Sequence, residues 1–184
     1  MSHYYWHRGE EYIPLFLLAQ NLPGFKSASL TAVSHPGPDA VLLFDDESKV
    51  TIQITCAGEN EITAYQRELL NDGQFVCANQ SASRSGETGK ITQSGRVLTT
   101  RAKNTQVAIG EVLLAIEKKK KKYRVGTQFL LISIRRSEIT MTKDWQQQLL
   151  VAVSALTAFP YERIYVATAH TCFACTQSTN PVKT

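Results

Sequence analysis

Three polar residues in one stretch of the chain are spaced so that their side chains could form a single site. Residues 38–55 predict two short strands joined by a turn, because the apolar run 40–44 precedes a polar segment and then alternating residues. Asp39 opens the first strand, and Gln53 and Thr55 share one face of the second. A carboxylate, an amide and a hydroxyl would meet there if Asp39 and Gln53 converge.

Each of these residues also has a simpler interpretation. An aspartate directly after Pro38 is typical of a turn that leads into a strand, so Asp39 needs no further role. Gln53 and Thr55 would be ordinary polar residues if that face of the strand is solvated. The sequence leaves both interpretations open.

The segment His170-Thr-Cys172-Phe-Ala-Cys175 has the spacing of a metal site. Two thiolates in a Cys-x-x-Cys suit zinc, and His170 or Cys77 would add a third ligand. Structural zinc sites usually take two such pairs, and the second pair is missing. We therefore do not expect zinc at Cys172 and Cys175; a redox dithiol and two ordinary cysteines are the other interpretations.

Other catalytic patterns are weak. Ser34 and His35 lie near Asp39 in the sequence, but no G-x-S-x-G element accompanies them. The chain also lacks G-x-G-x-x-G and Walker A sequences, so nucleotide-cofactor chemistry is not indicated.

Two groups of basic residues are candidates for contacts to nucleic-acid phosphates. One lies in the polar segment 79–104, where Glu87 is the acidic residue among them; the other is a run of five lysines that ends a predicted helix, with Arg135 and Arg136 nearby. The alternative for the lysine run is a solvated helix end, where cations also favour the helix dipole. The first group comprises Arg84, Lys90, Arg96, Arg101 and Lys103; the second comprises Lys118, Lys119, Lys120, Lys121 and Lys122.

The composition indicates a folded protein. The chain has 184 residues, of which 43% are hydrophobic and 20% charged, and its net charge is +4. These values predict one soluble domain over residues 1–184, with a core over about 10–170, an irregular loop at 79–104 and a loose tail at 176–184. No signal peptide or membrane-length apolar run is evident, and four cysteines do not make a disulfide scaffold, so we expect a cytoplasmic protein with no membrane partner.

The chain predicts an α/β fold. Helices are expected at 10–21, 59–71, 106–123 and from Thr142 to about residue 159, with Pro14 moving the first start towards Ile13. Strands are expected at 27–34, 40–44, 49–56, 129–134 and 163–168, with a short strand at 74–77 and a small hairpin at 91–98 turning at Ser94-Gly95. The late alternation of helix and strand predicts a parallel pairing in a mixed sheet covered by helices.

This order of elements, with Pro38-Asp39 opening the second strand and Gln53-Ile54-Thr55 on the third, resembles the restriction-endonuclease-like fold, the PD-(D/E)xK superfamily. The resemblance implies that acidic groups hold Mg²⁺ or Mn²⁺ and that a lysine helps to activate the attacking water. Carried over, Asp39 and Gln53 become the metal ligands and Thr55 takes the lysine position. Glu10 or Glu11 would match the glutamate that many members carry on the first helix.

The chain departs from that motif at two positions. Gln53 brings an oxygen without charge, and Thr55 brings neither a cation nor a base. Residues elsewhere would have to compensate: Glu59, Glu61 or Glu68 for the acid, and Lys49 or Arg67 for the lysine.

The resemblance therefore implies a divergent nuclease-like protein with Asp39, Gln53 and Thr55 as its catalytic residues, in which metal-dependent phosphodiester hydrolysis is weakened or lost. The alternative is a non-enzymatic module on the same fold that binds a nucleic acid or a protein. A small zinc-containing interaction protein is a third interpretation. DNA and RNA are equally compatible with the basic residues, and the oligomeric state is not predicted.

Overall fold

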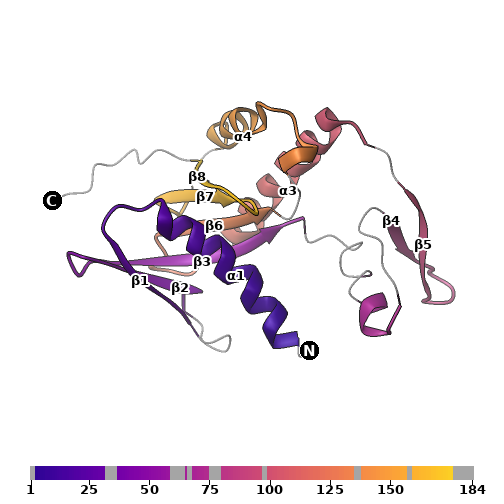
Figure 1. Cartoon of the computed structure of the whole chain (residues 1–184), viewed down its shortest axis with the longest axis horizontal. Helices are drawn as coiled ribbons and strands as arrows, with labels where there is room; N and C mark the ends of the chain where they lie inside the picture. Colours follow the sequence, from indigo (N-terminus) through magenta and orange to yellow (C-terminus); the bar gives the residue numbers. More distant parts are fainter. Residues whose placement is uncertain are drawn as a thin grey trace.

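The computed structural model describes residues 3–31, 37–58, 65, 68–74, 80–96, 99–134, 138–156 and 159–175, with the side chains of 3–10, 80–83 and 93–96 outside that description. The chain is a mixed α/β protein built on a six-stranded sheet of order β1-β2-β3-β6-β7-β8 (Figure 1). The helices described over their full length are α1 (His3–Gln20), α3 (Arg101–Lys121) and α4 (Trp145–Ser154), and a short 3-10 turn spans Glu138–Thr140. Its strands are β1 (Phe25–Leu30), β2 (Ala40–Phe44), β3 (Lys49–Ala57), β6 (Phe129–Ile134), β7 (Arg163–Ala167) and β8 (Cys172–Ala174).

The sheet changes from antiparallel to parallel at β3. β1, β2 and β3 form antiparallel pairs, whereas β3, β6 and β7 run parallel and β8 returns antiparallel at the edge. The long crossover from β3 to β6 carries α3 back over the sheet, as a parallel pair requires. The predicted parallel pairing in a mixed sheet is confirmed.

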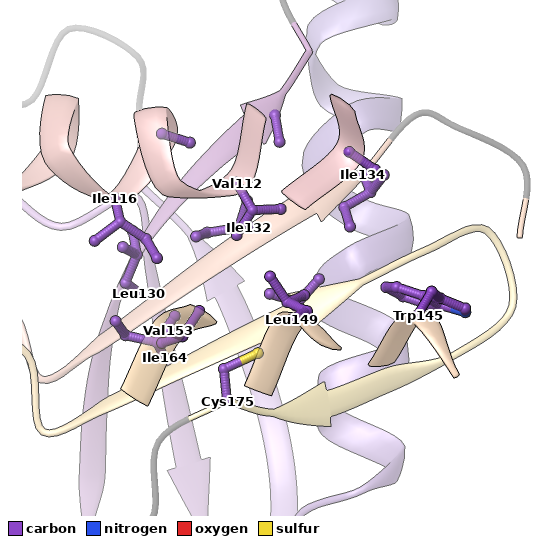
Figure 2. Close-up of a cluster of buried hydrophobic side chains, with 14 of the residues drawn as sticks. Val112, Ile116, Leu130, Ile132, Ile134, Trp145, Leu149, Val153, Ile164 and Cys175 are labelled. Atoms are coloured by element: carbon purple, nitrogen blue, oxygen red, sulfur yellow. The ribbon is translucent and has the colours of Figure 1, made fainter. Parts of the chain in front are cut away.

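Helices cover both faces of the sheet (Figure 1). On one face, Leu15 and Leu18 of α1 pack with Ile52 and Ile54 of β3 in a cluster of buried side chains that we call the α1 core. On the other, α3 and α4 enclose the α3/α4 core, which Figure 2 shows between these helices and the strands β6 and β7. The α3/α4 core includes Val112, Ile116, Leu130, Ile132, Ile134, Trp145, Leu149, Val153, Ile164 and Cys175.

The predicted alternation along β3 is confirmed. Ile52 and Ile54 belong to the α1 core. Gln53, which lies between them in the sequence, is buried on the other side of the sheet, the side on which Ala57 belongs to the α3/α4 core. The predicted bounds of β2 and β6 also match the structure, because each is an apolar run that fits a buried strand.

The predicted start of the first helix is wrong. α1 begins at His3 and contains Pro14 in its interior, although a proline there removes one backbone hydrogen bond. Burial of Pro14, Leu15 and Leu18 accompanies this irregularity, so packing outweighs the local preference. The helix end near Asn21 was predicted to within one residue.

The segment 79–104 is more regular than predicted. It forms a hairpin of β4 (Gln80–Arg84) and β5 (Ile91–Arg96), whose turn lies between Arg84 and Ile91 rather than at Ser94-Gly95. Helix α3 starts at Arg101, five residues before its predicted start at Gln106, because Thr100 caps it.

Several smaller boundaries also differ. β1 begins at Phe25 and ends at Leu30, while residues 32–34 of the predicted strand lie outside the described residues. Of the predicted helix 59–71, residue 65 and residues 68–71 are described as helical, and Gly73 follows them with a φ of 73°, as is typical of a glycine after a helix end. The predicted strand at 74–77 falls mostly outside the description, and Gln74 itself is not in a strand.

The predicted start of the last helix at Thr142 is wrong, since α4 begins at Trp145, and one strand was missed. Asp144 is the N-cap of α4 and makes no side-chain capping bond, while the Thr142 N–H donates to Thr105 Oγ1 at 2.9 Å. β8 was not predicted, because three residues carry too little periodicity.

Candidate functional site

Asp39 lies where β2 ends its pairing with β3. The ladder stops at Ala40 opposite Ile52, so the N–H of Ile54 has no strand partner on that side. Asp39 Oδ2 accepts this N–H at 2.7 Å, and the Asp39 side chain thereby extends the sheet by one hydrogen bond. The position of Asp39 thus has a structural cause that is independent of any chemistry.

Two cations face the Asp39 carboxylate. Arg124 Nη1 donates to Asp39 Oδ1 at 2.9 Å, and Lys119 Nζ lies 3.9 Å from Asp39 Oδ2. Arg124 also donates to the carbonyl of Gly37, which precedes the strand. Only 21% of the Asp39 side chain is exposed, so water screens these charges less than at an open surface. The carboxylate is therefore neutralised within the chain.

Gln53 is adjacent to Asp39 on the sheet but has other partners. Its side chain is 1% exposed, and its Oε1 accepts from the Tyr161 hydroxyl at 2.7 Å. Its amide Nε2 donates to the Lys122 carbonyl at 3.4 Å. The Tyr161 hydroxyl also lies 3.2 Å from the Lys119 carbonyl. The Gln53 amide thus serves the carbonyl of Lys122, the C-cap residue of α3, whereas the Lys119 carbonyl already accepts from the Lys122 N–H at 3.0 Å.

We call Asp39, Gln53, Lys119, Arg124 and Tyr161 the Asp39 network. Burial lowers the pKa of Lys119 below its ordinary value, and the negative charges of Asp39 and Glu11 act against this effect. Burial also raises the pKa of Tyr161 to about 12, so its hydroxyl stays protonated and available as a donor. Tyr123 packs edge-on against the Tyr161 ring, with centroids 5.2 Å apart.

The structure brings together some predicted site residues and separates others. Asp39 and Gln53 converge, whereas Thr55 lies two residues further along β3, half-buried opposite Ile132 of β6. Among the described residues, the hydrogen bonds of Asp39 and Gln53 do not include Thr55.

The residues expected to compensate for the altered motif are also spread out. Glu68 pairs with Arg84 away from the network, and Lys49 lies at the opposite end of the β2–β3 ladder from Asp39. Glu11 of α1 is half-buried and close enough for its charge to act on Lys119. Glu59, Glu61 and Arg67 lie outside the described residues, as does the side chain of Glu10.

The basic side chains that the structure describes do not form one continuous surface. α3 has 21 residues, and at about 1.5 Å per residue its ends lie about 30 Å apart. Exposed Arg101 and Lys103 are in its first turn, and exposed Lys118, Lys121 and Lys122 are at its other end beside the Asp39 network. Lys119 and Lys120 are half-buried there.

The basic residues of the hairpin differ in their environment. Arg84 donates to Glu68 and to the Gly89 carbonyl, and its guanidinium lies 5.3 Å from the centre of the Tyr65 ring. Lys90 is exposed at the start of β5. The Arg96 side chain, Arg135 and Arg136 lie outside the description.

Cys172 and Cys175 lie on opposite faces of the sheet. Cys172 belongs to the α1 core and Cys175 to the α3/α4 core. Burial raises the pKa of both thiols to about 12, which disfavours the thiolates that zinc binding and thiol redox chemistry use. His170 is exposed in the turn before β8, and Cys77, Ser34 and His35 lie outside the described residues.

Magnesium ordinarily takes charged oxygen ligands. In the described part of the chain, no group of three or more His, Cys, Asp and Glu side chains is arranged around a common metal position. In the Asp39 network, one carboxylate faces two cations and the neighbouring amide oxygen accepts from a phenol. This arrangement holds β2, β3 and the end of α3 together, and a metal ion would have to compete with Arg124 for Asp39.

Three residues of the network were not identified from the sequence in their actual roles. Lys119 was predicted as a phosphate contact, and Arg124 and Tyr161 were not singled out. A usable signal exists, since Arg124 and Tyr161 each come shortly before a strand of the parallel sheet, and the amino ends of neighbouring parallel strands lie together.

The chain has no match among protein-family models, curated proteins or solved structures. Within the described residues, no helix combines the length and the apolar character needed to cross a membrane.

Proposed function

We propose that this chain is a nucleic-acid-binding protein on a restriction-endonuclease-like fold, and that the position of the family's metal centre is taken by an internal ion-pair network. The order of elements supports the fold: a helix, an antiparallel three-stranded unit, and a crossover helix leading to a strand parallel to the third. The adjacency of Asp39 and Gln53 supports the correspondence with the motif positions.

One observation carries the choice of binding over cleavage. Arg124 Nη1 lies 2.9 Å from Asp39 Oδ1, where the resemblance would put a metal ion. A positive guanidinium and a Mg²⁺ ion compete for the same carboxylate, and the second acid that would favour the metal is replaced by an uncharged, hydrogen-bonded Gln53. A resident arginine therefore replaces the metal in balancing the charge of Asp39.

Nucleic acid is the favoured partner because of the exposed lysines beside the network. Lys118, Lys121 and Lys122 are exposed around the end of α3. Clustered lysines release counterions from a phosphate backbone, which gives an affinity that falls steeply with salt. A protein partner is the alternative, and it would show no such general dependence on phosphates.

A second candidate is metal-dependent phosphodiester hydrolysis with Mg²⁺ or Mn²⁺. It is favoured by Lys119, which lies 3.9 Å from Asp39 Oδ2 and would supply the cation that Thr55 lacks. In this alternative, Asp39 and Gln53 would hold the metal, whose chemistry would be to activate a water, and Lys119 would orient that water.

The deciding experiment measures binding and cleavage of single- and double-stranded DNA and RNA, with Mg²⁺ or Mn²⁺, for the wild type, Asp39→Ala and the exposed control Asp72→Ala. We expect salt-dependent binding by all three proteins and no cleavage. Metal-dependent cleavage that disappears in Asp39→Ala alone would support the second candidate instead. A folded wild type that binds none of the four nucleic acids would overturn both.

A further inference from the structure

The hairpin of β4 and β5 is the feature that the Asp39 network does not explain. Its two strands form a sheet of their own, and Figure 1 shows it standing apart from the six-stranded sheet. Arg84 ends β4 directly before the turn, and its contacts to Glu68 and to the Tyr65 ring hold this turn end of the hairpin on one side. An isolated two-stranded ribbon gains little stability from its own core, so the stability of the fold does not explain why the chain forms this hairpin.

The turn of the hairpin is held in one shape by its own hydrogen bonds. Ser85 N donates to the Lys90 carbonyl at 3.0 Å, and Gly89 N donates to the Ser85 carbonyl at 2.9 Å. Gly89 takes a φ of 64°, which favours glycine, and Arg84 Nη1 donates to its carbonyl at 3.0 Å. The hairpin therefore presents a preorganised tip.

The composition of the hairpin identifies the kind of partner. Ile91 is the one large apolar residue from 80 to 96, and the remainder is mostly Ser, Thr, Gln and Gly with three basic residues and Glu87. Protein partners are usually bound through apolar and aromatic cores, which this hairpin lacks. Interfaces with DNA are polar and positively charged, which this composition matches.

The dimensions of the hairpin select among nucleic acids. A two-stranded ribbon fits the major groove of B-DNA, about 12 Å wide, whereas the minor groove of about 6 Å would first have to be widened by bending the duplex. β5 has six residues, and at about 3.3 Å per residue it is about 20 Å long and reaches beyond the groove depth of about 8.5 Å. The major groove of duplex RNA is too narrow for side chains to read.

We propose that the β4–β5 hairpin inserts into the major groove of duplex DNA, with exposed Thr88, Lys90 and Thr92 at the base edges and phosphates. Hydroxyl groups can donate to or accept from base edges, and a lysine can bind guanine or a phosphate. This inference rests on the proposed function and narrows it from nucleic acids in general to duplex DNA.

The test uses fluorescence anisotropy of the full chain with a DNA duplex, the matching RNA duplex and one single DNA strand at low salt. The variant is Lys90→Glu, and the matched control is Lys49→Glu, which changes an exposed lysine at the start of β3, away from the hairpin (Figure 1). We expect Lys90→Glu to weaken DNA-duplex binding by about tenfold and Lys49→Glu by less than about twofold.

A second measurement uses the wild type alone. Methylation of guanine N7, which lies in the major groove, should weaken binding, whereas netropsin in the minor groove should leave it unchanged. Displacement by netropsin, equal affinity for duplex RNA, or equal effects of the two lysine variants would overturn the hairpin inference while the proposed function stands. Failure to bind any nucleic acid would overturn both.

Discussion

At the scale of single residues, Asp39 shows how one side chain can serve structure and charge together. Its Oδ2 completes the hydrogen bonding of β3 through Ile54, and its Oδ1 faces Arg124. Each partner makes the other more favourable, since a carboxylate fixed by a backbone N–H needs less reorganisation to meet a cation. Loss of the cation would leave a poorly solvated charge in place.

We expect Arg124→Met to lower the free energy of unfolding by about 1–2 kcal/mol, between the values typical of exposed and of buried ion pairs. The measurement is urea unfolding of each variant. Arg84→Met is the control, because its partner Glu68 is 47% exposed against 21% for Asp39. Equal decreases in the free energy of unfolding for the two variants would contradict an extra destabilisation from the less exposed Asp39 carboxylate.

Tyr161→Phe should destabilise the chain by about 1–3 kcal/mol, because Gln53 Oε1 would keep its burial but lose the hydroxyl that donates to it. Tyr12→Phe removes a hydroxyl from a side chain that is 49% exposed, and it should change the free energy of unfolding by less than about 0.5 kcal/mol. A Tyr161→Phe protein as stable as this control would show that water replaces the missing donor.

The same tyrosine gives a pH dependence. The pKa of Tyr161 is raised from its ordinary value of 10.0 to about 12. The folded chain therefore binds this proton more strongly than the unfolded chain, so the resulting stabilisation is present below pH 10 and lost as the pH rises towards 12. Stability measured from pH 9 to 12 should fall less in Tyr161→Phe than in the wild type. A parallel decline in both proteins would exclude this contribution.

Residue-scale prediction from sequence succeeded for positions on one strand and failed for partners far along the chain. The shared face of Gln53 and Thr55 followed from alternation alone. The partners of Gln53 did not, because Tyr161 is 108 positions away and the Lys122 carbonyl 69 positions away. Such contacts depend on the packing of α3 against the sheet, which no local pattern contains.

At the scale of elements, α3 has two ends of different character. Thr100 caps its start by accepting from Lys103 N at 3.2 Å, while the Gln53 amide donates to the carbonyl of the C-cap residue Lys122 at its other end. The lysines in the last turn also favour the negative end of the helix dipole, whereas Arg101 and Lys103 in the first turn do not. The Thr100 cap is therefore expected to contribute more to the stability of α3 than a cap at its other end would.

Thr100→Ala should lower the free energy of unfolding by about 1 kcal/mol, and Thr100→Ser should restore most of the loss, because serine supplies the same capping oxygen. Thermal unfolding of the three proteins checks this expectation. Gln106→Ala, at an exposed position of the same helix outside the cap, serves as the control and should stay close to the wild type. A Thr100→Ser protein as unstable as Thr100→Ala would attribute the effect to the methyl group rather than to the cap.

Element-scale prediction worked where burial and local preference agree. The apolar run of β6 was predicted to the residue, since it suits a strand covered on both faces. Pro14 misled the prediction of α1, because the local preference against an interior proline was outweighed by the packing of Leu15 and Leu18. The turn of the β4–β5 hairpin was misplaced because Ser94-Gly95 and the Gly86–Gly89 segment both contain turn residues.

At the scale of the whole molecule, the positive charge is divided between distant places. Arg101 and Lys121 lie at opposite ends of α3, about 30 Å apart, which is far beyond the Debye length of about 8 Å at physiological salt. A duplex long enough to reach both ends would meet them as independent contacts.

The effects of Arg101→Glu and Lys121→Glu on the free energy of DNA binding should therefore add in the double variant to within about 0.5 kcal/mol. Titration of a long duplex with all four proteins of this cycle gives the coupling. A coupling well above that value would mean that the two ends share one contact on the nucleic acid, or that the helix changes when one end is altered.

The parallel pairing of β3 with β6 also bears on how fast the chain folds and how it can diversify. Thr51 N donates a hydrogen bond to Gln128 Oε1, which lies 77 positions further along the sequence. Closing so long a loop is slow relative to forming local contacts, so this pairing is expected late in folding. The entropy of closure grows only with the logarithm of loop length, and doubling the loop adds about 0.6 kcal/mol. Evolution could therefore lengthen, shorten or exchange the hairpin carried in this loop at little cost to the sheet.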